Sequence, residues 1–201
     1  MDTVGNAERV LRLASERGVL RTRDLTDYRI PRTTLSRLLE SGRLVQISRG
    51  LYALPDHSRS EQHQLADVAV RSPQGVFCLL TALRFHDLTT QSPHEIWIAI
   101  PNKGHPPRLD YPPLRIVRFS GAALTQGIET HVVDGVNVRV YAVAKTVADC
   151  FKYRNKIGLD VALEALRESR REKRATNDEL WHYAKICRVA NVMRPYMESI
   201  E

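Results

Sequence analysis

All the positively charged residues among the first sixty are arginines, and the arginine side chain is well suited to bind phosphate. This segment has eleven Arg, no Lys and seven acidic residues, a net charge of +4. A guanidinium group can hold a phosphate or the edge of a guanine base with two hydrogen bonds, whereas lysine is a point charge. Residues 61–201 have nineteen basic and sixteen acidic side chains, a net of +3. The sequence therefore predicts a nucleic-acid-binding surface in the first third of the chain.

Residues that could catalyse a reaction or hold a metal follow none of the familiar spacings. The seven histidines show neither the HExxH pattern nor an i, i+4 pair, and the chain has no GxSxG, GxxxxGK[ST] or GxGxxG motif. Cys78, Cys150 and Cys187 lack CxxC spacing and sit among apolar residues, so we expect them to fill the core. We expect no metal site, no cofactor and no enzymatic activity.

One charged pair in the second half of the chain leaves two interpretations open. Lys145 and Asp149 stand four residues apart in a segment that should be helical, so their side chains share one face of the helix. They could serve as a base and an acid. A pair with this spacing is more commonly an exposed ion pair that supports its own helix.

Three helices must position the arginines of the first segment. Asn6 and Gly18 predict the two ends of a first helix, and Thr22 predicts the start of a short second one. A third helix is expected from Pro31, at the first helical position, to a stop at Gly42. A short helix, a tight turn and a further helix form the helix-turn-helix arrangement.

The third helix has two different faces. Leu35, Leu38 and Leu39 fall on an apolar face, and polar side chains with two arginines fall on the other. After it, two short strands are expected around a turn that exposes Arg49, which is the wing of a winged helix. We expect the helix to enter the major groove and the wing to reach phosphate or the minor groove. The predicted DNA-binding residues are Arg23, Arg32, Thr33, Ser36, Arg37, Arg43 and Arg49.

A polar linker that begins with Leu54-Pro55 separates this segment from a second domain. The predicted domains are therefore residues 1–56 and 60–201. The second domain is expected to contain helices, about four strands and helices again, at 60–70, 75–88, 95–100, 114–119, 128–133, 136–141, 142–153, 158–170 and 177–189, before a tail with Pro195. Asp134-Gly135 is a strong turn signal for a hairpin. The fold class is α+β, an N-terminal winged helix-turn-helix followed by a mixed α+β domain.

The chain shows no signal for membrane insertion or export. Its longest nearly uncharged run, residues 75–83, is far shorter than the roughly 20 apolar residues that span a bilayer. The N-terminus lacks the apolar core of a signal peptide. We expect a cytoplasmic protein.

Several segments together resemble the AbiEi family of antitoxins from type IV toxin–antitoxin systems. In the first third these are Ile30-Pro31-Arg32-Thr33-Thr34-Leu35 and Leu44-Val45-Gln46-Ile47-Ser48-Arg49-Gly50-Leu51-Tyr52. Further along they are residues 80–89, 95–100 and 140–151. The resemblance covers nearly the whole chain, and the Arg-Gly-Leu-Tyr of the wing is its most specific part.

The resemblance implies a bacterial toxin–antitoxin operon of the kind used in phage defence. The N-terminal domain would repress its own promoter, and the second domain would counteract a nucleotidyltransferase toxin of the AbiEii type, by contact or by function. Because one winged helix reads a short half-site, we expect two copies on double-stranded DNA with an inverted repeat. By the same resemblance Arg49 corresponds to the wing arginine, and Arg32, Thr33 and Arg37 to the outer face of the recognition helix. The toxin-directed candidates are Lys145, Asp149 and Lys152.

Two other functions fit a winged helix joined to a second domain. One is a transcription regulator whose second domain senses a small ligand. The other is a DNA-targeted, metal-dependent hydrolase with acidic metal ligands in the second half, but no carboxylate–lysine cluster on a strand is recognisable there. The antitoxin that represses its own operon is the preferred interpretation.

Overall fold

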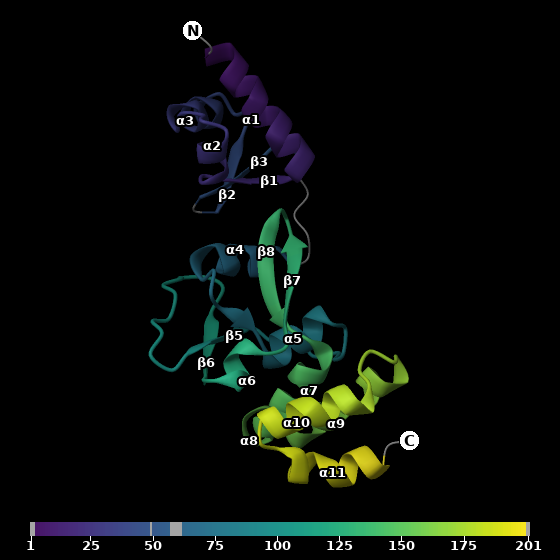
Figure 1. Ribbon diagram of the computed structural model, residues 1–201. Coiled ribbons are helices and arrows are strands. Elements are labelled where there is room, and N and C mark those ends of the chain that lie inside the picture. Colours follow the sequence, from purple (N-terminus) through teal and green to yellow (C-terminus); the bar gives the residue numbers. More distant parts are fainter. Residues whose placement is uncertain (1–2, 49, 57–61, 200–201) are drawn as a thin grey trace. The chain divides into compact units, whose positions relative to one another are not determined.

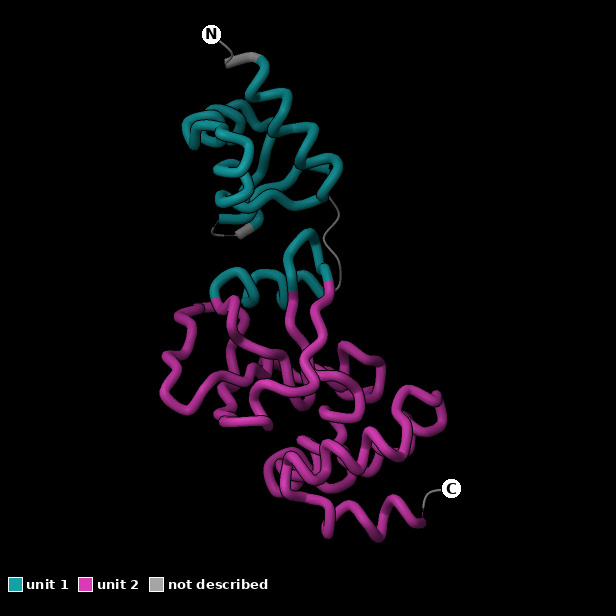
Figure 2. The backbone as a smooth tube through the Cα atoms, viewed as in Figure 1, with its two compact units in different colours: residues 1–71, 132–137 teal, residues 72–131, 138–201 magenta. Residues whose placement is uncertain are grey.

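Two compact units make up the chain (Figure 2). In the computed structural model, residues 3–48, 50–56 and 62–199 are described, so the predicted wing residue Arg49 lies outside the described residues. The first unit comprises residues 1–71 and 132–137, and the second comprises 72–131 and 138–201. The domain boundaries expected from the sequence, 1–56 and 60–201, stay a prediction.

The first unit contains a winged helix. Its elements are α1 (Thr3–Arg17), β1 (Val19–Arg21), α2 (Asp24–Asp27), α3 (Thr33–Glu40), β2 (Val45–Ser48) and β3 (Leu51–Ala53) (Figure 1). The strand order is β1-β3-β2, with β3 antiparallel to both neighbours. The three helices and the sheet enclose an apolar core that includes Val10, Leu20, Leu25, Leu35 and Leu38. The predicted winged helix is confirmed.

Strand β1 was not anticipated. Gly18 has a φ of 74°, so it ends α1 in the left-handed region, and the chain then extends. Val19 and Leu20 pair with Ala53 and Tyr52 of β3. A strand of three residues is too short to show an alternating pattern, and its partner lies about thirty residues away in the sequence.

The first unit also contains α4 (His63–Arg71) and the tip of the hairpin formed by β7 (Ile128–Val133) and β8 (Val136–Tyr141). Asp134 and Gly135 have φ values of 46° and 71°, as a two-residue type I′ turn requires. A Cβ on Gly135 would lie 2.9 Å from the carbonyl oxygen of Arg17 and 3.0 Å from that of Val19. Only glycine fits this turn, and the predicted hairpin is confirmed.

A five-stranded sheet forms the centre of the rest of the chain. Its order is β6-β5-β4-β8-β7, where β4 is Val76–Phe77, β5 is Ile96–Pro101 and β6 is Leu114–Phe119. β4 is antiparallel to β5 and parallel to β8, and β5 is parallel to β6. The prediction of a single helix over 75–88 is wrong at its start. Residues 76–77 form the middle strand of the sheet, and only α5 (Leu79–Phe85) is helical.

The second unit contains the central helix α7 (Val143–Lys152). Its other helices are α5, α6 (Ala122–Thr125), α8 (Arg154–Ile157), α9 (Leu159–Arg171), α10 (Asn177–Ile186) and α11 (Ala190–Ser199). α5, α9 and α10 pack on α7, and residues 143–151 of α7 are buried. The expected tail with Pro195 is instead α11, with the proline inside the helix.

The core of the second unit contains all three cysteines. Cys78, Cys150 and Cys187 are buried and free, as the sequence predicts. Burial raises the pKa of the Cys150 thiol well above its usual value, so this side chain stays protonated. In the part of the chain that the structure describes, no helix is long and apolar enough to cross a membrane.

Candidate nucleic-acid interface

The outer face of α3 presents the predicted DNA-binding side chains to solvent. Arg32, Thr33, Ser36 and Arg37 are all exposed, whereas Leu35 and Leu38 on the inner face are 4% and 3% exposed. The predicted division of this helix into two faces is therefore confirmed. Its start is shifted, because Arg32 is the N-cap and Pro31 lies just outside the helix.

Two more predicted residues, which lie outside α3, are also exposed. Arg23 is exposed and is the N-cap of α2. Arg43 is exposed just after α3, where Gly42 has a φ of 66° and the Arg43 N–H donates to the carbonyl of Leu38 at 2.9 Å. The C-terminal turn of α3 thus fixes the backbone from which Arg43 projects. Binding of DNA by any of these residues stays a prediction.

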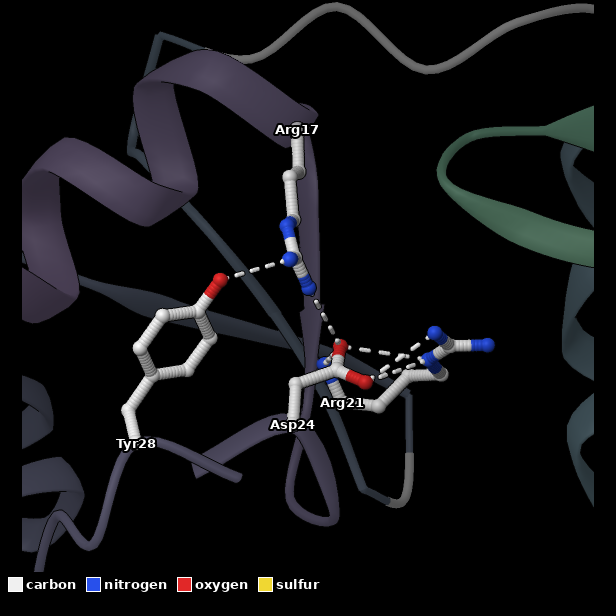
Figure 3. Close-up of polar contacts among 4 residues, drawn as sticks. All are labelled: Arg17, Arg21, Asp24 and Tyr28. Carbon is white, nitrogen blue, oxygen red and sulfur yellow. Dashed lines mark hydrogen bonds and ion pairs between the residues drawn. The ribbon is translucent and has the colours of Figure 1, made fainter. Parts of the chain in front are cut away.

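A buried carboxylate, Asp24, holds two other arginines inside the first unit (Figure 3). Asp24 accepts from the backbone N–H of Arg21 at 2.9 Å and from its Nε at 3.0 and 3.1 Å, and it pairs with its Nη2 at 3.0 Å. Arg17 lies 3.9 Å from the same carboxylate and donates to the hydroxyl of Tyr28 at 2.9 Å.

This network joins β1 to the first turn of α2. The Asp24 side chain is only 5% exposed, so its charge is neutralised mainly by Arg21. From the sequence alone, every arginine of this segment counts as a source of positive charge. An aspartate three residues after an arginine, in the first turn of a helix, was the signal that Arg21 is engaged within the protein. Arg21 is therefore engaged within the protein, whereas the predicted residues Arg23, Arg32, Arg37 and Arg43 are exposed.

Replacing Asp24 by Asn is expected to loosen the start of the helix-turn-helix. The substitution leaves the Arg21 guanidinium half-buried without a counter-charge, which should lower the free energy of local opening by about 1–3 kcal/mol. Hydrogen exchange measured on peptides covering residues 19–30 of the full chain reports this change. Asp27→Asn, on the exposed side of the same helix, is the matched control. Equal exchange rates in the two variants would contradict the role given to Asp24.

The second unit buries the charged pair of α7. Lys145 and Asp149 are each 0% exposed, and the Lys145 Nζ donates to the Asp149 Oδ2 at 2.5 Å. The Nζ also lies 4.0 Å from the ring centroid of Tyr141 and 4.8 Å from that of Phe119. The interpretation as an exposed pair is wrong, because later helices cover the face of α7 on which both side chains lie.

The other carboxylate oxygen of Asp149 faces a cysteine. The Cys187 thiol donates to Asp149 Oδ1 at 3.2 Å. Burial and the nearby carboxylate raise the pKa of Cys187 to about 12, so the thiol stays protonated and can donate. Burial likewise raises the pKa of Asp149, and the Lys145 ammonium opposes this rise. Ammonium, carboxylate and thiol therefore form a buried network that satisfies both oxygens.

Of the three toxin-directed candidates, Lys152 alone reaches the surface, at the end of α7. Lys145 and Asp149 have no exposed area through which to touch another molecule, so any influence on a partner must pass through the packing around α7. The toxin-directed role of all three stays a prediction. Within the described ranges no group of three His, Cys, Asp or Glu side chains could hold a metal ion.

The first unit thus has a winged-helix fold, with arginines on the outer face of α3. Residues 8–55 match the family described as "Transcriptional regulator, AbiEi antitoxin". The resemblance to AbiEi antitoxins is confirmed over this N-terminal region.

A solved structure has a similar fold over most of the chain. It is the crystal structure of the RV2827C protein from Mycobacterium tuberculosis, which aligns with a TM-score of 0.55 and 16% sequence identity, over 90% of this chain and 71% of that one. At this identity the likeness is one of fold alone. No curated protein matches the chain.

Proposed function

We propose that this chain is an antitoxin that also represses its own operon by binding promoter DNA. The observation that carries the proposal is the exposed, arginine-bearing face of α3 within the segment that matches the AbiEi transcriptional regulators. In this proposal Arg32 and Arg37 read base edges in the major groove, and Arg23 and Arg43 bind phosphate. Arg49, at the tip of the wing in the sequence, is assigned to phosphate or the minor groove.

The length of α3 limits how much DNA one copy can read. Eight residues at about 1.5 Å each give a helix of roughly 12 Å, which faces only a short stretch of the major groove. Two copies on an inverted repeat would double the site and set a fixed spacing between half-sites. We therefore propose double-stranded promoter DNA with an inverted repeat as the first partner, bound by a pair of chains.

The second partner is a nucleotidyltransferase toxin of the AbiEii type, neutralised by the second unit in the cytoplasm. This part of the proposal rests on the resemblance of residues 80–89 and 140–151 to the antitoxin domain of the family. Lys152, at the exposed end of α7, is the candidate for direct contact. The chain acts by binding and is proposed to have no enzymatic activity, metal or cofactor of its own.

Two readouts in one bacterial host test the proposal. A reporter driven by the chain's own promoter measures repression, and growth during expression of the nucleotidyltransferase encoded beside it measures neutralisation. The full chain should repress the reporter and restore growth. The Arg32→Ala, Arg37→Ala double variant should lose repression and still restore growth. The full chain could instead fail to restore growth and dissociate from promoter DNA only when a small ligand is added. That result would favour a ligand-sensing regulator.

A further inference from the structure

A cavity of about 370 Å³ in the second unit gathers three positive side chains. They are Arg118, Lys152 and Arg188, which come from positions far apart in the sequence. Among the described residues that line the cavity, none is acidic. Three like charges around one hollow produce a local positive potential, which an anion between them would offset. The cavity therefore has the charge of an anion site.

Arg118, on β6, is held in place by the loop that follows the neighbouring strand β5. Its Nη1 donates to the carbonyl oxygens of Pro101 at 3.1 Å, Asn102 at 2.7 Å and Gly104 at 2.9 Å. The Nε and Nη2 of the same guanidinium have no hydrogen-bond partner in the described part of the chain. One nitrogen thus anchors the side chain, and the others remain available to a ligand.

Lys152 and Arg188 approach the cavity from two other elements. Lys152 is the last residue of α7, and Arg188 follows the end of α10. Neither forms an ion pair with any residue that the structure describes, in contrast to Arg171, which pairs with Glu168 and Glu172. The charges of Lys152 and Arg188 are therefore not used in ion pairs within the described part of the protein.

The remaining wall fits the organic part of a small ligand. Tyr153 and Ile186 are half-buried and supply apolar surface, and Ser120 supplies a hydroxyl. Burial raises the pKa of Tyr153 to about 12, so its phenol stays neutral at pH 7 and adds no negative charge. A volume of about 370 Å³ lies within the range of small-molecule sites, roughly 300–1,000 Å³.

We propose that this cavity binds the phosphate group of a small phosphate monoester of about the size of a mononucleotide. A phosphate monoester carries a charge of about −2 at pH 7 and offers three acceptor oxygens, which match two guanidinium groups and one ammonium. Nothing in this assignment depends on DNA binding by the first unit or on neutralisation of a toxin.

Titration calorimetry on the purified full chain tests the site with four probes: inorganic phosphate, adenosine 5′-monophosphate, adenosine and a single-stranded DNA dodecamer. The monophosphate should bind one equivalent per chain, and adenosine should not bind. Replacing Arg188 or Lys152 by Ser should each weaken monophosphate binding at least tenfold. Arg167→Ser, an exposed arginine on α9 that does not line this cavity, removes the same charge and should leave the affinity unchanged.

Four outcomes would overturn the proposal. One is that the monophosphate does not bind, and another is that it binds equally to the Arg188→Ser and Arg167→Ser variants. A third is that the dodecamer binds and the monophosphate does not, which would assign the three cations to a nucleic-acid backbone. Circular dichroism confirms that each variant is folded, and the two independent serine variants keep the test decisive if one of them fails to fold. Binding of inorganic phosphate alone would show an adventitious ion only and would also count against the proposal.

Discussion

Replacing Lys145 by Met is expected to destabilise the second unit by about 3–5 kcal/mol, because the substitution leaves the Asp149 carboxyl buried without its ammonium partner. Asp149 is 0% exposed and its Oδ2 accepts directly from the Lys145 Nζ. The remaining thiol of Cys187 is a weak donor and cannot replace a positive charge. The expected loss is a large fraction of the roughly 5–15 kcal/mol that is typical of a whole domain.

The two tryptophans of the chain make this measurement specific to one unit. Trp97 and Trp181 both belong to the second unit, and the sequence contains no others. Urea unfolding followed by tryptophan fluorescence therefore reports the second unit, whatever the first unit does. The midpoint of the transition and its slope give the free energy of unfolding for each variant.

Two controls separate the ion pair from a general sensitivity of the helices. The Lys145→Met, Asp149→Leu double variant should recover most of the lost stability, because it removes both charges and keeps apolar volume in the core. Arg171→Met breaks an ion pair whose arginine is 70% exposed, and should change the free energy of unfolding by less than about 0.5 kcal/mol. A Lys145→Met protein as stable as the wild type would contradict the role of the pair.

The features that the sequence predicted correctly depend on neighbouring residues. The two faces of α3 follow from the spacing of Leu35 and Leu38, and the hairpin follows from Asp134-Gly135, whose left-handed φ angles few other residue pairs adopt. Each signal is contained within about ten residues. Local patterns of this kind are enough for the three helices of the winged helix and for α7, α9 and α10 of the second unit.

The features that were missed depend on residues far apart in the sequence. β4 is two residues long and is defined by its pairing, such as that of Phe77 with Val140. The spacing of Lys145 and Asp149 predicts that they share a face of a helix, but it cannot show that α9 and α10 cover that face. The cavity at Arg118, Lys152 and Arg188 brings together residues separated by seventy positions. Periodicity and spacing contain no information about such contacts.

Replacing Arg37 by Ala is expected to weaken binding to the chain's own promoter by about 1–3 kcal/mol, and replacing Arg32 and Arg37 together by roughly 2–6 kcal/mol. Both side chains are exposed on the face of α3 that is proposed to enter the major groove. A buried leucine stripe fixes the opposite face, so neither substitution should disturb the fold. Fluorescence anisotropy with a labelled promoter duplex measures the loss.

The decisive control compares promoter affinity with that of a variant at an arginine of the same unit that does not lie on α3. Arg12→Ala on α1 removes the same charge from a side chain that is 71% exposed and paired with Glu16, so it should leave promoter affinity nearly unchanged. Repeating each titration over a range of salt distinguishes the two kinds of contact. Losing a phosphate contact lowers the salt slope by about one unit, whereas losing a base contact weakens binding mainly to the specific sequence. Equal affinities for the Arg37→Ala and Arg12→Ala proteins would show that the first unit binds DNA through its overall positive charge. The assignment of α3 as the helix that reads bases in the major groove would then be wrong.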